Sequence, residues 1–86
     1  MRLDPLPEGG FVIDAKDLGP LLGIEPARVP ALMREGRITR RFETGEGEDE
    51  GRFRLTFLHE GVTVRLIVAA DGTVLQRSRI VGAAPR

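Results

Sequence analysis

The sequence contains no cysteine, and among its 86 residues it has one histidine, one serine and one lysine. Without cysteine, disulfides, thiolate zinc sites and cysteine nucleophiles are excluded. Any other nucleophile needs a serine, threonine or lysine beside a base, and no local spacing joins His59, Ser78 and Lys16. We therefore expect no catalytic residues and no enzymatic activity, and we interpret His59 as a residue that flanks a turn.

Motifs for metals and cofactors are also missing. The stretch 45–51 carries four acids between three glycines, but its spacing does not match the alternating ligands of an EF-hand. Paired carboxylates of the glycosidase type would have to come from Asp14, Asp17, Glu43 or these loop acids, and nothing distinguishes them from helix caps and solvated charges. We expect no metal, no cofactor, and a mobile, solubilising loop at 45–51.

Long hydrophobic runs are absent. The longest unbroken apolar stretch is 66–70, whereas a membrane-spanning helix needs about 20 residues. No basic segment leads into an apolar run near the N-terminus, as it would in a secretory signal. The length, with 41% apolar and 30% charged residues, is typical of one small globular domain. We expect a cytoplasmic protein without membrane contact.

The chain carries no excess of either charge, since 13 basic and 13 acidic residues give a net charge of +0. Nonspecific nucleic-acid binding draws on clustered Lys and Arg, so general nucleic-acid binding is disfavoured. The charges are unevenly distributed: residues 1–36 hold four basic and six acidic groups, a net −2, and residues 37–86 are therefore +2.

Turn-forming residues divide the chain. Residues 1–10 contain Pro5, Pro7 and a Gly9-Gly10 pair, which predict a disordered lead-in. The single domain is expected at 11–82, followed by a tail at 83–86. It opens with a short strand at Phe11.

Two short helices are expected next. Asp14 is a candidate N-cap, and Gly23 and Gly36 mark the two helix ends. Prolines at 20, 26 and 30 should tighten or kink both helices. The apolar positions with helical spacing are Leu18, Leu21 and Leu22 in the first helix, and Val29, Leu32 and Met33 in the second.

From Arg37 onward the apolar residues alternate, which predicts strands. A two-residue Glu60-Gly61 turn pairs Phe57 with Val64, and each neighbouring pair on that face is then also apolar. A two-residue loop at the next turn, Asp71-Gly72, would set the apolar Leu66 opposite Arg77. This mismatch favours a bulge or a longer loop before a last strand at about 74–81.

These patterns predict an α+β domain: a short N-terminal strand, two short helices, and an antiparallel meander of three or four strands with the helices on one face. The expected core is Leu18, Leu21, Leu22, Leu32, Met33, Phe53, Leu55, Phe57, Val64, Leu66 and Val68.

The other sheet face holds two arginines diagonally across neighbouring strands, Arg54 and Arg65. Like charges in that arrangement need an anion, supplied either by the acidic loop 46–50 or by an external phosphate, carboxylate or acidic partner. We favour the loop. RNA-binding sheets pair such cations with exposed aromatic rings, and Phe53 and Phe57 have the opposite parity.

The stretch 14–38 resembles the helix-turn-helix of excisionase and MerR-type regulators, on Leu18-x-x-Leu-Leu-Gly-Ile, Val29, Leu32-Met33 and Gly36-Arg37-Ile38. That resemblance implies an alternative, a DNA-binding protein with Arg28, Arg34 and Arg37 as DNA contacts. Net acidity of 1–36 and the two prolines of the second helix oppose it, so binding of nucleic acid is not expected.

The chain from Phe-Val-Ile-Asp through Leu-Met-Arg-Glu-Gly-Arg-Ile-Thr, the acidic glycine-rich loop, Gly-Arg-Phe-Arg-Leu-Thr-Phe and Asp-Gly is similar to a family of small proteobacterial proteins of unknown function. The resemblance spans about residues 8–82; it implies a bacterial cytoplasmic protein and no activity. Our interpretation is a non-enzymatic interaction or regulatory module, with a protein partner or a second copy bound through an exposed strand edge.

Overall fold

The structure is a computed structural model that describes residues 1–82, apart from the side chain of Asp49. The tail predicted at 83–86 lies outside the described residues. In chain order the elements are β1 (Asp4–Pro5), β2 (Phe11–Val12), α1 (Ala15–Leu22), the 3-10 turn η1 (Pro26–Arg28), α2 (Val29–Arg34), β3 (Thr39–Thr44), the 3-10 turn η2 (Gly47–Asp49), β4 (Arg52–His59), β5 (Val62–Ala69) and β6 (Val74–Val81).

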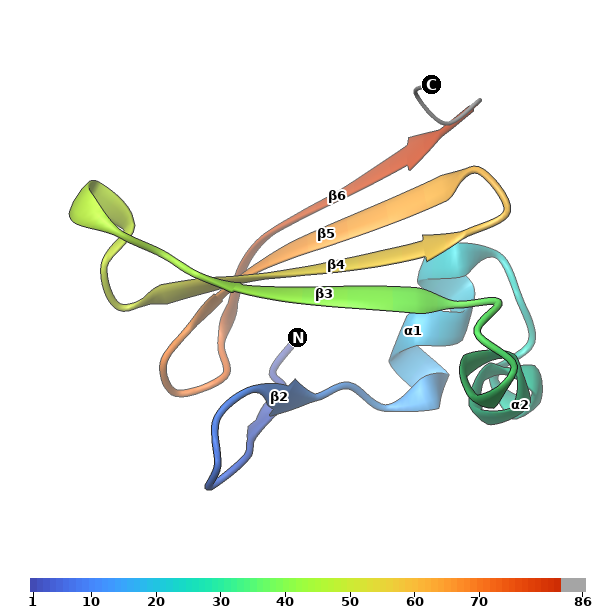
Figure 1. Cartoon of the computed structure of the whole chain (residues 1–86), viewed down its shortest axis with the longest axis horizontal. Coiled ribbons are helices and arrows are strands. Elements are labelled where there is room, and N and C mark those ends of the chain that lie inside the picture. Colours follow the sequence, from blue (N-terminus) through green and yellow to red (C-terminus); the bar gives the residue numbers. More distant parts are fainter. Residues whose placement is uncertain (83–86) are drawn as a thin grey trace.

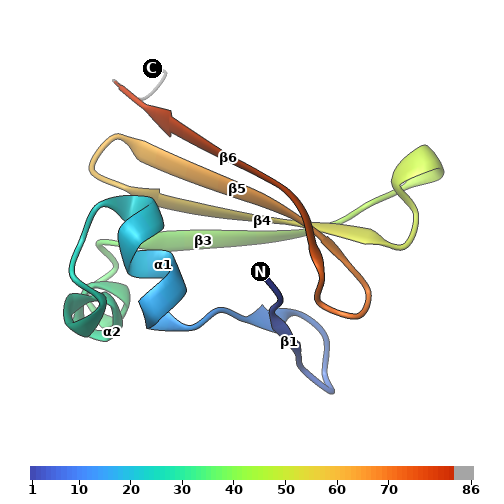
Figure 2. The ribbon, with the colours of Figure 1, turned by 180° about the vertical axis from the view of Figure 1, so that it is seen from behind.

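The four longer strands form one antiparallel sheet in the order β3-β4-β5-β6. Helices α1 and α2 lie against one face of this sheet together with the small β1–β2 sheet, and no described element covers the other face (Figures 1 and 2). The predicted α+β fold, a meander with both helices on one face, is confirmed. The other face of the sheet therefore forms a surface of the molecule itself.

The hairpin of β4 and β5 has the predicted register, with Phe57 opposite Val64. Both turn residues have positive φ, 44° at Glu60 and 80° at Gly61, as a two-residue turn that matches the strand twist requires. The agreement of turn and alternation fixes which side chains reach the core.

A bulge between Ile67 and Val68 shifts the register of β5 and β6, also as predicted. It leaves Leu75 without a direct partner, so that Val68 pairs with Val74 while Leu66 pairs with Arg77. The bulge does not place an apolar residue opposite Leu66, because Arg77 and Arg79 still stand opposite the buried Leu66 and Val64.

Both helices show the expected ends. The Asp14 carboxylate accepts a hydrogen bond from the Lys16 N–H (3.1 Å), and Gly23 closes α1 with φ of 77°. The second helix has only six residues, because η1 occupies the segment that begins at Pro26. In residues 1–82 no helix is long and apolar enough to cross a membrane.

A core forms between the helices and the covered sheet face. Most of the predicted core residues are buried, while Leu21, Met33 and Phe53 are partly buried. The buried apolar residues are Leu3, Phe11, Leu18, Leu22, Val29, Leu32, Ile38, Leu55, Phe57, Val64, Leu66 and Val68. The prediction missed Leu3, Phe11, Val29 and Ile38.

The N-terminal ten residues correct the expectation of a disordered lead-in. Leu3 is only 2% exposed, and its N–H donates to the Gly72 carbonyl oxygen at 2.7 Å. Asp4–Pro5 pairs with Phe11–Val12. Residues 1–3 lie along the β5–β6 loop, and the prolines and glycines that follow form the tight turn between β1 and β2. This segment therefore closes one end of the core.

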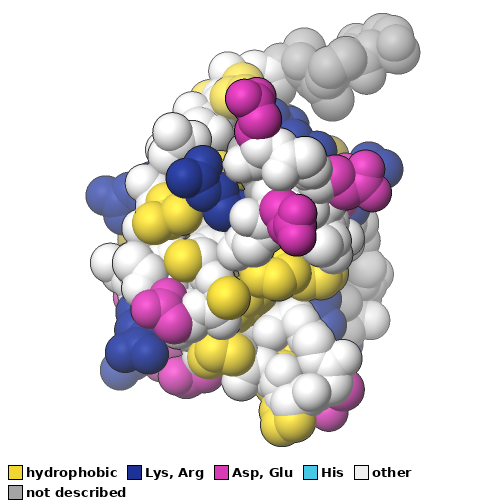
Figure 3. All heavy atoms as spheres, turned by 90° about the vertical axis from the view of Figure 1, so that its left-hand side faces the viewer, with side chains coloured by type: hydrophobic (Ala, Val, Ile, Leu, Met, Phe, Trp, Pro, Cys, Tyr) yellow, Lys and Arg dark blue, Asp and Glu magenta, His cyan; other side chains and the backbone are white. Residues whose placement is uncertain are grey.

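Three phenylalanines make an aromatic cluster beside β3. The ring of Phe53 lies 5.4 Å from that of Phe11 and is stacked on Phe42 at 5.6 Å. Phe42 stays 43% exposed. At the end of the molecule from which the loop after β3 projects, hydrophobic side chains gather among acidic and basic ones (Figure 3).

Candidate functional site

The uncovered face of the sheet, called the open face below, is a grid of side chains set by the strand registers. Alternate residues of each strand point to this face because successive side chains of a strand alternate. Its members are Thr39, Arg41 and Glu43 on β3, Arg52, Arg54, Thr56 and Leu58 on β4, Thr63, Arg65, Ile67 and Ala69 on β5, and Gln76, Ser78 and Ile80 on β6.

Basic groups dominate the open face. Four arginines stand there against one described acidic side chain of the strands, Glu43. None of the open-face residues is aromatic. The chain as a whole is neutral, so folding has gathered positive charge on one surface.

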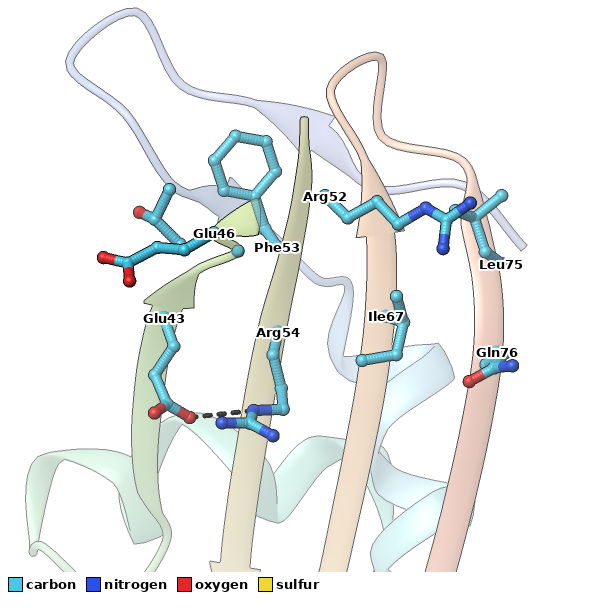
Figure 4. A pocket seen from close by; sticks show the side chains of 10 residues that line it. Glu43, Glu46, Arg52, Phe53, Arg54, Ile67, Leu75 and Gln76 are labelled. Carbon is cyan, nitrogen blue, oxygen red and sulfur yellow. Dashed lines mark hydrogen bonds and ion pairs between the residues drawn. The ribbon is translucent and has the colours of Figure 1, made fainter. Parts of the chain in front are cut away.

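Arg54 has a carboxylate partner on the neighbouring strand. Its Nε donates to Glu43 Oε1 at 2.9 Å (Figure 4). That hydrogen bond, followed by the positive charges of Arg54, Arg41 and Arg65, lowers the pKa of Glu43 below its ordinary value. The sequence pattern favours the loop 46–50 as the source of an anion for Arg54 and does not point to Glu43, because the long loop after β3 leaves open the register that places Glu43 opposite Arg54.

Arg65 differs from Arg54. It lies near the middle of the open face, opposite Thr56 on β4 and Ser78 on β6. Within residues 1–82 its guanidinium makes no ion pair and no side-chain hydrogen bond. The two arginines predicted to share an anion are thus brought together as expected, but the described carboxylate serves Arg54.

Two adjoining hollows follow the open face. The larger, of about 800 Å³, has Ile67 in its floor between Arg54 and Gln76, with Arg52 and Glu46 toward the loop end (Figure 4). The smaller, of about 490 Å³, is lined by Arg54, Arg65, Ile67, Gln76, Arg77 and Ser78. They share Arg54, Ile67 and Gln76, so an extended ligand can cross both.

His59, Ser78 and Lys16 are not brought together by the fold. His59 is 6% exposed; its Nδ1 donates to the Arg37 carbonyl oxygen at 2.7 Å, and its Nε2 lies 2.9 Å from Glu60 Oε2. Lys16 is on α1, on the covered side, whereas Ser78 is on the open face. His59 is therefore a residue that ties the start of β3 to the β4–β5 turn. In the part of the chain that the structure describes, no three His, Cys, Asp or Glu residues could hold a metal together.

The three arginines of the helix-turn-helix alternative lie on the helical side. Arg28 ends η1, Arg34 ends α2, and Arg37 follows α2 with Glu35 3.8 Å from its guanidinium. All three are exposed. The helix that would enter a DNA groove has six residues and includes Pro30.

Comparison with curated proteins and with solved structures found no significant match to this chain. A match over the whole chain is found with a family described only as one of unknown function, in agreement with the resemblance noted from the sequence. The protein, matched over residues 1–86, belongs to the family of unknown function DUF6522.

Proposed function

We propose that this protein is a non-enzymatic binding module of the bacterial cytoplasm that docks an acidic segment of a partner protein on its open sheet face. Arg65 would pair with a carboxylate of the partner, and Gln76 and Ser78 would supply hydrogen bonds. Ile67 would contact an apolar group between the acids. The observation that carries the proposal is Arg65, a central arginine without a described carboxylate partner beside an arginine that has one.

Charge complementarity selects an acidic partner. Guanidinium groups bind carboxylates through planar, paired hydrogen bonds, and the open face offers several of them around one hydrophobic floor. Single-stranded nucleic acid fits less well, because sheets that bind it stack bases on aromatic rings. Here the aromatic side chains of β3 and β4 point to the covered face.

Catalysis is not part of the proposal. Both ring nitrogens of His59 face acceptors of the protein itself, so this histidine has no nitrogen directed at a ligand. The helix-turn-helix alternative calls for a helix that reads base edges, and the short α2 with its proline supports it poorly. Binding of duplex DNA is kept as an outcome of the test.

A chemical-shift titration tests the proposal. The labelled protein is titrated with a peptide that alternates acidic and apolar residues, and in separate arms with inorganic phosphate, single-stranded DNA and duplex DNA. We expect saturable shifts from the acidic peptide at Arg65, Ile67, Gln76 and Ser78. Substitution Arg65→Gln should weaken the peptide about three- to tenfold, the loss of roughly 0.6–1.4 kcal/mol for an exposed ion pair with good geometry.

Arg28→Gln is the matched control, because it removes the same charge from an exposed arginine on the helical side. It should leave the peptide affinity unchanged. The proposal is overturned by equal losses in both variants, which would mean general charge attraction, or by no saturable shift on the open face. Tight duplex binding with shifts at Arg28, Arg34 and Arg37 would establish the DNA-binding alternative instead.

A further inference from the structure

We infer that two copies of this chain associate through their β3 edges, in an antiparallel register centred on Phe42, so that the two sheets become one. The inference does not rest on the proposed function, since it concerns pairing along the edge of β3, although Glu43 and Thr44 of that strand also line the larger hollow. It rests on the exposure of β3, on its backbone geometry and on the order of its charges.

β3 is one of two edge strands of the described sheet. Five of its six residues are exposed, and Glu43 is half-buried. Phe42 is an exposed aromatic residue on this edge, with its ring stacked on Phe53. An open edge with a large apolar side chain is a template for another strand.

The backbone N–H and C=O groups along the free edge of β3 are oriented to pair with another strand. The Gly45 N–H donates to the Arg52 carbonyl oxygen at 2.9 Å, which makes these two residues a hydrogen-bonded pair of the β3–β4 ladder. Such pairs alternate along antiparallel strands. The N–H and C=O groups of Arg40, Phe42 and Thr44 therefore point away from β4, toward the free edge.

A register centred on Phe42 matches these groups. Phe42 of one copy faces Phe42 of the other, and Arg40 faces Thr44 in both directions, so the outward N–H and C=O groups meet one another. On the covered side, the two Phe42 rings join the two aromatic clusters. Cross-strand aromatic pairs of this kind stabilise antiparallel sheets.

The charges agree with the same register. Arg41 of each copy stands opposite Glu43 of the other on the open face, because both are one residue from the centre. In a single chain no described carboxylate pairs with Arg41. The Glu43 carboxylate would then lie between Arg54 of its own chain and Arg41 of the second copy.

Neighbouring registers lack this match. Centring on Arg41 sets Arg41 against itself, and centring on Glu43 sets two carboxylates together, which is destabilising for directly opposed like charges. Of these three registers, only the one centred on Phe42 sets Arg41 opposite Glu43 at both symmetry-related positions. The self-complementarity is what a two-fold interface requires.

The other edge, β6, offers no such arrangement. Its charged residues are Arg77 and Arg79, and it has no acid, so no self-pairing of β6 can join opposite charges. Arg79 is also engaged within the chain, since its Nε donates to the Leu21 carbonyl oxygen at 2.6 Å. The β3 edge is therefore the one that fits a second copy.

Charge exchange tests the register. Sedimentation of the wild type over a concentration series should show monomer converting to dimer. On the open face of β3, R41E presents two acidic side chains and E43R two basic ones. Each variant alone should therefore raise the dimer dissociation constant on the order of tenfold, because two symmetry-related pairs change from attraction to repulsion. An equimolar mixture of the two variants should dimerise again, because each then supplies the charge that the other lacks.

R77E, on β6, is the matched control and should leave dimerisation unchanged. Amide exchange gives a second readout: the N–H groups of Phe42 and Thr44 should become protected as concentration rises, while that of Glu43, bonded to β4, should not change. A wild type that stays monomeric up to its solubility limit overturns the inference. So does a dimer that R77E weakens, or a mixture of R41E and E43R that remains monomeric.

Discussion

The two faces of the sheet show what folding does and does not require of this sequence. The covered face carries Leu55, Phe57, Val64, Leu66 and Val68, all at most 5% exposed. The open face carries arginines, threonines and scattered apolar residues. Burial of apolar area stabilises the first set, whereas exposed charges add little to stability. The residues of the open face are thus the ones whose identity folding leaves unexplained.

The largest effect on stability should come from truncating Phe57, on the covered face of β4, and its neighbour Leu58, on the open face, is the control. Phe57→Ala removes a side chain that is 1% exposed and should lower the free energy of unfolding by about 3–5 kcal/mol. Leu58→Ala, at a site 41% exposed, should cost less than about 1 kcal/mol. Urea unfolding of both variants measures the difference, and equal losses would contradict the assignment of the faces.

A loss nearly as large is expected at Leu3, which the structure places in the core. Leu3→Ala should lower the free energy of unfolding by about 2–5 kcal/mol. Met1→Ala, at an exposed position, is the matched control and should have a small effect. If Leu3→Ala were as mild as Met1→Ala in the same denaturant titration, the N-terminal segment would not be part of the core.

These two sites also mark what could be predicted. The place of Phe57 follows from local signals, a two-residue turn at Glu60-Gly61 and alternation on both sides of it. Leu3 depends on a hydrogen bond to Gly72, at the far end of the chain, and no local pattern announces such a pairing. The prolines and glycines that follow Leu3 have the composition of a disordered segment.

The candidate site was predictable in part for the same reason. Arg54 and Arg65 were placed on one face by the register of β4 and β5, which is fixed by a short turn. Glu43 was missed because the seven-residue stretch 45–51 separates β3 from β4 and leaves their register open. The pairing of Glu43 on β3 with Arg54 on β4 therefore could not be predicted from the sequence and is known only from the structure.

A smaller effect should appear in the pH dependence of stability. The hydrogen bond from Arg54, with the nearby arginine charges, depresses the pKa of Glu43 below 4.5. A carboxyl group with a depressed pKa contributes stability that is present above its unfolded pKa and is lost as the pH falls through the folded pKa.

Glu43→Gln should therefore be less stable than the wild type at neutral pH, and the two stabilities should converge as the pH falls through the depressed pKa of Glu43. Urea midpoints measured from pH 7 to pH 2.5 check this. A difference between the two proteins that stays constant over the whole range would show that the Glu43–Arg54 contact does not stabilise the charged form.

The smallest effect on folding, and the most informative, is expected at Arg65. We propose that this arginine serves binding and not stability. We therefore propose to measure, for Arg65→Gln and the wild type, both the free energy of unfolding and the affinity for an acidic peptide. We expect stabilities within about 0.5 kcal/mol of each other and an affinity for the peptide that is reduced about three- to tenfold in the variant. A variant that binds the peptide as well as the wild type, or one that loses stability in proportion to affinity, would contradict it.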